Sequence, residues 1–158
     1  MKRLLLYLFA TLCISCGRQL DKALELSEGV SKDLAAHRKA QVSGVKYHLS
    51  FNIPEKKEDS IRSKLLLELD IIDPDQPLVL DFKSDKENPG SATVNGVATP
   101  IQYQKEHLII PAGQLKKGTN KIEIEFTAGE MSLNRNEDYL FTLLVPDRAR
   151  TLFPCFDQ

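Results

Sequence analysis

From residue 43 onward, apolar and polar side chains alternate with a period of two over several segments. Between residues 61 and 72, for example, Leu65, Leu67, Leu69 and Ile71 share one side, and mostly charged residues share the other. Because successive side chains of a strand point to opposite faces, this period predicts β-strands with one buried and one wet face. We expect seven such strands, at residues 43–53, 61–72, 78–82, 92–94, 97–103, 107–110 and 121–126.

Turn residues separate these strands. Pro54 ends the first strand, and two further prolines lie in the turn cluster at residues 73–77, where the missing N–H groups cannot extend a ladder. Asn95-Gly96 is the strongest local signal, because both residues tolerate the positive φ angles of a two-residue hairpin turn. The pattern therefore predicts an all-β fold, an antiparallel β-sandwich or saddle-shaped sheet.

The segment before the strands is polar and helix-prone. Residues 17–42 have only a partial helical stripe, broken at Gly29. Ser31 to Asp33 can cap a short helix over residues 34–40. We interpret residues 16–42 as a tether followed by this helix; an amphipathic helix that binds a partner is the alternative.

One segment near the carboxyl end has no alternation. Residues 139–145 (YLFTLLV) are almost all apolar and stop at Pro146, after a polar stretch at residues 128–138. We expect a loop over the polar stretch. The apolar run predicts a strand that is buried on both faces or lies beneath another domain.

The amino terminus indicates export. A short basic start precedes the apolar run of residues 4–12, which is too short for a membrane-spanning helix. Ser15 followed by Cys16 fits a lipoprotein cleavage site, so we expect a signal peptide at residues 1–15 and lipidation of Cys16. The protein would then be a lipoprotein anchored in the membrane of the cell envelope, on the periplasmic side or in the outer membrane. A plain signal peptide cut nearby, or an anchor that is never cut, is the alternative.

Composition and charge narrow the remaining functions. The formal net charge is -1 and lysines are interleaved with glutamates, which argues against nucleic-acid binding. His37, His48 and His107 have no second His or carboxylate at ligand spacing, so we expect no metal, cofactor or catalytic residue in this chain. We place His48 and His107 at solvent-facing positions or turns. If Cys13 is removed and Cys16 acylated, Cys155 cannot form a disulfide, and we expect it to be a buried apolar residue.

The carboxyl-terminal stretch DRARTLFPCFDQ resembles the AR-x-x-FPCFDEP signature that closes the amino-terminal domain of the aminopeptidase N family of zinc metallopeptidases. The residues that match are Arg150, Phe153, Pro154, Cys155, Phe156 and Asp157. The run IPAGQLKKGTNKIEIEF (residues 110–126) is similar to another stretch of that domain. The resemblance implies that residues 43–158 form this β domain, with an incomplete carboxyl edge and with these six residues as a domain-interface motif. Within that motif, we expect Arg150 to make a structural ion pair.

The resemblance also implies what lies elsewhere. Zinc and the H-E-x-x-H and G-x-M-E-N segments would belong to a following catalytic domain, which would be the partner of this one and would bind the peptide substrate. Alone, this chain is predicted to be inactive. In the family, an acid that helps to hold the free amine of the substrate falls at the position of Val145, where this chain has an apolar residue instead.

A different class of function is also consistent with the sequence. A stand-alone β-sandwich lipoprotein of the envelope could bind a glycan, a peptide or a protein partner. Such a module should bury Phe153 and Phe156 completely, whereas a domain that continues into a neighbour should leave them exposed.

Overall fold

The structure is a computed structural model that describes residues 25–84 and 91–158. It confirms the predicted antiparallel, mostly β fold with one short α-helix. In order, the elements are α1 (Lys32–Gln41), β1 (Val42–Asn52), β2 (Arg62–Ile71), β3 (Leu78–Asp81), β4 (Ala92–Val94), β5 (Val97–Ala98), β6 (Gln102–Gln104), β7 (His107–Ile110), η1 (Ala112–Gln114), β8 (Gly118–Thr127), β9 (Leu133–Arg135), β10 (Leu140–Thr142) and η2 (Ala149–Thr151).

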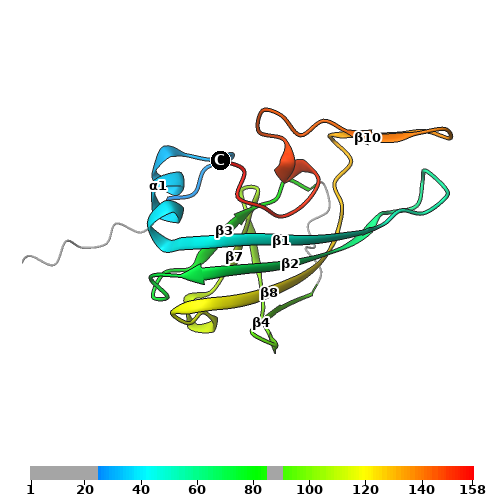
Figure 1. The fold of residues 1–158 in the computed structure, drawn as a ribbon. Helices are drawn as coiled ribbons and strands as arrows, with labels where there is room; N and C mark the ends of the chain where they lie inside the picture. The colour runs from blue at the N-terminus through cyan, green and yellow to red at the C-terminus, as the bar shows by residue number, and fades with distance from the viewer. Residues whose placement is uncertain (1–24, 85–90) are drawn as a thin grey trace, which may run out of the picture.

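The strands form two packed layers and a separate hairpin. The larger sheet has the order β1-β2-β8-β4-β5, the smaller one has the order β3-β7-β6, and β9 pairs only with β10 (Figure 1). One continuous apolar core contains buried residues of both larger sheets, including Leu67 and Ile122 from one and Leu80 and Leu108 from the other. This layer-on-layer packing is how sheets with one apolar face bury it.

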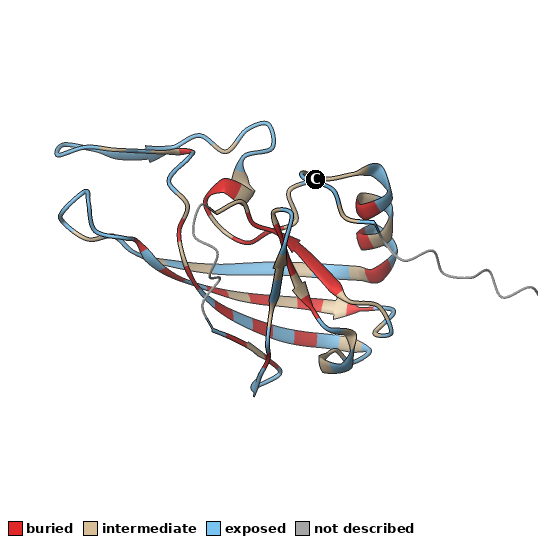
Figure 2. Ribbon diagram, turned by 180° about the vertical axis from the view of Figure 1, so that it is seen from behind, coloured by how far each residue is buried: buried red, intermediate tan, exposed pale blue. Residues whose placement is uncertain are grey.

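The alternating pattern translates directly into burial. In β2, residues 65, 67, 69 and 71 face the core and are no more than 1% exposed, while Lys64 on the other face is exposed. Strand β8 pairs with β2 along its length and repeats the alternation, as the red and blue bands of Figure 2 show. A one-residue slip of either strand would turn its apolar set to solvent, so the pattern fixes this register.

The turn at Asn95-Gly96 is confirmed, with φ angles of 52° and 83° between β4 and β5. The predicted strand over residues 97–103 is wrong, because the structure divides it into β5 and β6, which belong to different sheets. Pro100 lies between them and has no N–H to continue a ladder. The predicted loop at residues 128–138 is also partly wrong, since it contains β9.

The predicted short helix is present and is packed into the domain. Ser31 caps α1 by accepting the N–H of Leu34 at 3.1 Å. Leu34, Arg38 and Gln41 are buried, and the chain passes from α1 directly into β1. A helix with this much buried surface is held by tertiary contacts as much as by its own propensity.

The amino-terminal expectations concern residues outside the described range. The signal peptide at residues 1–15 and the lipidation of Cys16 both precede residue 25, where the description begins. Among the described helices, none has the length and apolar character needed to span a bilayer.

Candidate functional site

The carboxyl-terminal motif lies on the inner side of edge strand β1. Leu152 and Cys155 are buried in the core, whereas Phe153 and Phe156 are half-buried. The ring of Phe153 makes edge contacts with Tyr47 and Phe51, with centroids 6.5 Å and 6.4 Å apart. The motif therefore covers a part of β1, and its two phenylalanines are neither completely buried nor fully exposed.

Main-chain hydrogen bonds fasten this motif to β3. Asp81 N–H donates to the carbonyl of Cys155 at 2.7 Å, and Cys155 N–H donates back to Asp81 at 3.0 Å. The carboxylate of Asp81 also accepts the N–H of Asp157, with 2.9 Å between the nitrogen and Oδ2. Asp81 thus binds the motif through both its backbone and its side chain.

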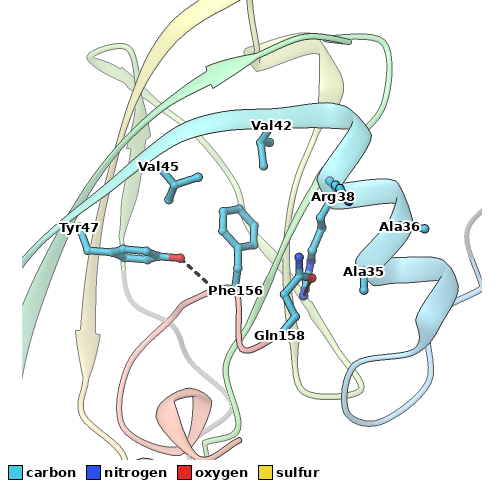
Figure 3. A pocket seen from close by; sticks show the side chains of 9 residues that line it. Ala35, Ala36, Arg38, Val42, Val45, Tyr47, Phe156 and Gln158 are labelled. Carbon is cyan, nitrogen blue, oxygen red and sulfur yellow. Dashed lines mark hydrogen bonds between the residues drawn. The ribbon is translucent and has the colours of Figure 1, made fainter.

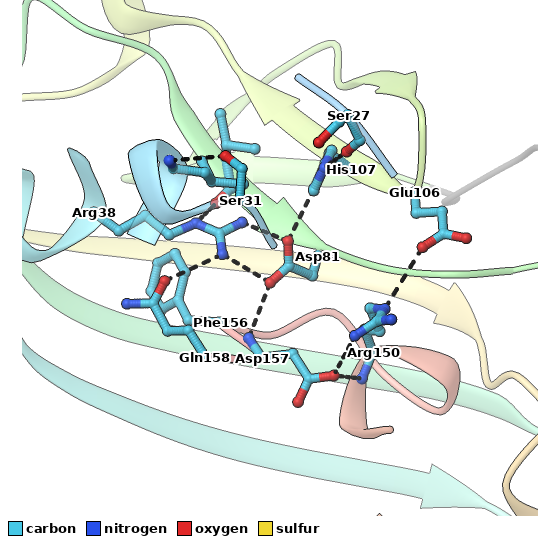
Figure 4. A network of polar contacts seen from close by, with 12 residues as sticks. Ser27, Ser31, Arg38, Asp81, Glu106, His107, Arg150, Phe156, Asp157 and Gln158 are labelled. Atoms are coloured by element: carbon cyan, nitrogen blue, oxygen red, sulfur yellow. Dashed lines mark hydrogen bonds and ion pairs between the residues drawn. The ribbon is translucent and has the colours of Figure 1, made fainter. Parts of the chain in front are cut away.

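The same carboxylate pairs with a buried arginine of α1 (Figure 4). Arg38 donates from its two terminal nitrogens to the two Asp81 oxygens at 2.6 Å and 2.8 Å, and from Nε to the carbonyl of Val79 at 3.0 Å. Both side chains are almost fully buried, at 1% and 0% exposed. Two parallel charge-assisted bonds fix the relative orientation of the two groups as well as their distance.

His107 completes this network. Its Nδ1 lies 2.9 Å from Asp81 Oδ1, and its Nε2 lies 2.9 Å from the carbonyl oxygen of Ser27. The prediction that His107 faces solvent or a turn is wrong, since its side chain is fully buried at the start of β7. His48, in β1, is exposed as predicted. The alternating pattern of a four-residue strand cannot show that a polar residue such as His107 is buried beside a polar partner.

The surroundings of Asp81 determine its ionisation. Burial would by itself raise the pKa of the Asp81 carboxyl, but hydrogen bonds from His107 and Arg38 outweigh it, so that the pKa lies below its ordinary value. Asp81 is therefore an anion whose charge is compensated inside the domain. A buried ion without these partners would cost several kcal/mol, about 3–5 when one member of a pair is removed.

Arg150 makes ion pairs beside the motif, in agreement with the structural role expected for it. Its guanidinium lies 3.3 Å from Asp157 and 3.4 Å from Asp147, and its Nε lies 3.6 Å from Glu106. Its main-chain N–H also donates to Asp157 at 3.2 Å. These contacts hold the turn between η2 and residue 158. The Arg150 guanidinium is therefore paired with carboxylates of this same domain.

Cys155 is buried, as the sequence predicted. Burial raises the pKa of its thiol far above the usual range, and the nearby carboxylates of Asp157 and Asp81 raise it further. A thiolate, which is the reactive form, is therefore disfavoured at neutral pH. This cysteine acts as a small core residue.

A shallow groove opens beside the motif, between α1, β1 and the chain end (Figure 3). It has a volume of about 670 Å³ and a mostly apolar lining that includes Val42, Val45 and Phe156. The Tyr47 hydroxyl borders it and accepts the N–H of Phe156 at 3.0 Å. Burial raises the pKa of Tyr47 to about 12, so the hydroxyl stays protonated at neutral pH.

The apolar run at residues 139–145 has the opposite surroundings. It forms β10 and the segment after it, and Tyr139, Phe141, Leu143 and Val145 are all more than half exposed. The prediction of a strand buried on both faces is wrong, because among the described residues β10 pairs with β9 alone and its side chains stay exposed. Val145 is the most exposed of the four, at 66%.

Arg135 attaches this hairpin to the rest of the domain. Its guanidinium donates to main-chain carbonyls of the turn between β1 and β2, at Pro54, Lys56, Lys57 and Asp59. The two hairpins consequently extend from the same end of the molecule (Figures 1 and 2). One arginine on several carbonyls positions the hairpin without covering its apolar side chains.

The described residues do not fit a zinc site. Within residues 25–84 and 91–158, no group of three or more His, Cys, Asp or Glu side chains is arranged to hold a metal ion. The ring of His107 already faces Asp81 and Ser27, and His48 is exposed on a strand. No step of zinc chemistry is assigned to these residues.

Comparison with solved structures identifies the architecture. The fold matches an M1 zinc metallopeptidase from Deinococcus radiodurans with a TM-score of 0.59 and 16% sequence identity, over 74% of this chain. The same score and identity relate it to a mutant of that enzyme bound to a Tyr-Ser-Ala substrate, and to a two-domain M1 zinc metallopeptidase mutant bound to L-arginine. This chain has the fold of one part of an M1 zinc metallopeptidase.

The match covers only a part of each of these solved structures. The chain spans 29% of the length of these M1 enzymes. No family model matches the sequence, and no curated protein does so. At this identity the likeness establishes the fold, while activity and partners require an argument of their own.

The carboxyl-terminal motif is recognisable in the sequence, but the network of Arg38, Asp81 and His107 that holds it is not. Arg38 lies in a polar segment and Asp81 ends a short apolar strand, so neither residue stands out in the sequence. Arg38 and Asp81 are 43 residues apart, and Asp81 and His107 are 26 residues apart, so no local sequence period links them. A usable signal was the single acid that ends the otherwise apolar run LVLD of β3, because a buried acid requires a partner.

Proposed function

We propose that this chain is the amino-terminal β domain of an exported zinc aminopeptidase of the M1 type. Hydrolysis of peptides from the amino end would take place in a following catalytic domain, which would hold the zinc. The observation that carries the proposal is the fold match to 29% of an M1 zinc metallopeptidase over 74% of this chain. The carboxyl-terminal motif supports it independently, through six residues that resemble the signature of the family.

The β9–β10 hairpin is the proposed contact surface for the catalytic domain. A two-stranded hairpin is marginally stable by itself in water, and exposed apolar patches of this kind mark interaction sites. Tyr139 and Phe141 lie side by side with ring centroids 5.7 Å apart, and Leu143 and Val145 continue the apolar surface toward the motif. Docking there would cover the side chains that this domain leaves in solvent.

The proposal includes a lipid anchor. Acylation of Cys16 would hold the enzyme at an envelope membrane, with residues 17–31 as the connection to α1. Metabolic labelling with a radioactive fatty acid should mark the wild-type protein. The Cys16→Ser variant should be unlabelled and should leave the membrane fraction, and labelling that persists in the variant would contradict this part of the proposal.

The central test compares two proteins. The product of the reading frame continued past Gln158 should contain H-E-x-x-H and should cleave a chromogenic aminoacyl substrate in a chelator-sensitive manner. The purified 158-residue chain with added zinc should not. Chelator-sensitive turnover by the 158-residue chain would refute the proposal, as would a continued frame without peptidase motifs, which would favour a stand-alone envelope binding module.

A further inference from the structure

A single carboxylate joins three parts of the domain that are far apart in the sequence. Asp81 receives Arg38 from α1, faces His107 from β7, and accepts the main-chain N–H of Asp157 at the chain end. His107 extends the connection to Ser27 before the helix. We refer to Arg38, Asp81, His107 and the Asp157 N–H together as the latch.

The structure assigns to Asp81 the role of a positioning residue for the carboxyl-terminal motif. Through the latch, Asp81 holds residues 155–157 against α1 and β7. The direction in which the chain runs at Gln158 is therefore set by the amino-terminal helix. The amino-terminal and carboxyl-terminal segments of the domain form one unit.

Apolar packing alone does not fix the motif to this extent. Phe153 and Phe156 are only half-buried, so part of each ring has no packing partner in this domain. The hydrogen bonds that Asp81 and Tyr47 accept, by contrast, define the positions of the N–H groups of Asp157 and Phe156. The bidentate Arg38 pair fixes the carboxylate itself, and the guanidinium also lies 5.4 Å from the centre of the Phe156 ring.

The consequence for a longer protein rests on the proposed function. Gln158 Oε1 lies 3.4 Å from an Arg38 nitrogen, so α1 contacts even the last residue of this chain. In the full-length aminopeptidase, the latch would set the angle between this domain and the catalytic domain. The latch itself can be tested in this chain alone, so the failure of one claim is distinguishable from the failure of the other.

The buried thiol of Cys155 provides the measurement. In the full chain carrying Cys13→Ser and Cys16→Ser, solubilised in mild detergent, Cys155 is the sole thiol. Its labelling by a maleimide without denaturant reports how often the motif opens. Asp81→Asn should increase the labelling rate roughly tenfold or more, because the carboxylate that pairs with Arg38 and accepts the Asp157 N–H loses its charge, while only the main-chain bonds to Cys155 remain. The rate should depend only weakly on urea, as expected for local opening.

Matched variants separate positioning from general destabilisation. Val94→Ala removes core atoms from β4, on the far side of the sheet from β1, and should change labelling only in parallel with global stability. If Asp81→Asn does not fold, Arg38→Lys keeps the charge without the bidentate pair and should give a several-fold increase. The inference is overturned if the latch variants and Val94→Ala label equally at matched stability.

The full-length enzyme tests the consequence. There, Arg38→Lys should reduce kcat/KM for peptides severalfold while the zinc content stays unchanged. Faster labelling of Cys155 without this loss of activity would confirm the latch and reject its effect on the catalytic domain.

Discussion

Two apolar stretches near the carboxyl end of this domain are held in opposite ways. The motif at residues 150–157 is anchored by polar groups, through Asp81, Tyr47 and the ion pairs of Arg150. The hairpin at residues 133–145 is joined to the domain through Arg135 and through Leu133 and Leu144, which pack against the core. Its two strands share a short ladder of three residue pairs. Polar contacts therefore fix the position of the motif, while several apolar side chains of the hairpin are exposed to solvent.

This difference shows what determines whether an apolar segment is buried or exposed. Both stretches are rich in aromatic and aliphatic residues, so hydrophobicity alone would bury both. The motif lies between β1, β3 and α1, where Asp81 and Tyr47 accept hydrogen bonds from its N–H groups. Among the described strands, β10 pairs with β9 alone. The motif is therefore packed into this domain, whereas the apolar side chains of the hairpin stay exposed and form the surface that we propose for the catalytic domain.

The largest expected effect is on the anchored side of this comparison. Arg38→Met should lower the free energy of unfolding by about 3–5 kcal/mol, because it leaves the Asp81 carboxylate buried without its main partner. Urea denaturation measures this loss. Lys39→Met, at the exposed neighbouring position, should change stability by less than about 0.5 kcal/mol. Equal effects at the two positions would mean that the ion pair does not hold the motif.

Acid should act on the same group. The folded pKa of Asp81 lies below its unfolded value, so its stabilising contribution is complete above about pH 4 and is lost as the pH falls through the folded pKa. The urea midpoint, followed from about pH 5 downward, should therefore decrease more steeply in the wild type than in Asp81→Asn. Parallel curves for the two proteins would show that Asp81 does not titrate as the structure indicates.

The sequence predicted the regular parts of this fold well. The period of two fixed β2 and β8 because every second residue there meets the same core, and Asn95-Gly96 located its turn because few residues tolerate positive φ. These are local relations. The strand predicted across Pro100 was wrong because that prediction passed over a residue without an N–H, which is the point where the chain leaves one sheet for the other.

The candidate site could be predicted only in part. The motif was recognisable as a contiguous string of residues. The burial of His107 and the pairing of Arg38 with Asp81 depend on contacts across many residues, which no spacing rule encodes. The exposure of Phe141 has a related explanation. The apolar pattern of residues 139–145 left open whether the strand is buried on both faces or lies beneath another domain, and the first of these alternatives is wrong.

A substitution at Gly129, just after β8, tests how closely the motif approaches this part of the chain. A Cβ built there would lie 2.0 Å from the carbonyl oxygen of Thr151, so the chain could not keep its present path. Gly129→Ala should destabilise the domain by about 1–3 kcal/mol. Gly113→Ala, where a Cβ meets open space, is the matched control and should be near neutral in thermal unfolding. Tolerance of alanine at 129 would indicate a looser motif.

A matched pair of phenylalanines compares the two stretches directly. Phe153→Ala should cost about 2 kcal/mol, because a half-buried ring loses its contacts with Tyr47 and Phe51. Phe141→Ala should cost less than about 0.5 kcal/mol in this chain, since its side chain is 52% exposed. Phe141→Ala should also reduce self-association measured by analytical ultracentrifugation. A reversal of the two stabilities would contradict the assignment of motif and hairpin.

The smallest expected effect isolates one hydrogen bond of the motif. Tyr47→Phe removes the hydroxyl that accepts the Phe156 N–H at 3.0 Å but keeps the ring beside Phe153. It should lower stability by about 1 kcal/mol, the usual net contribution of one such bond, because its site is partly open to water. Amide hydrogen exchange should show faster exchange at Phe156, while exchange at Leu67 in β2 stays unchanged. Uniform acceleration at both amides would mean that the hydroxyl stabilises the whole domain rather than directing the motif.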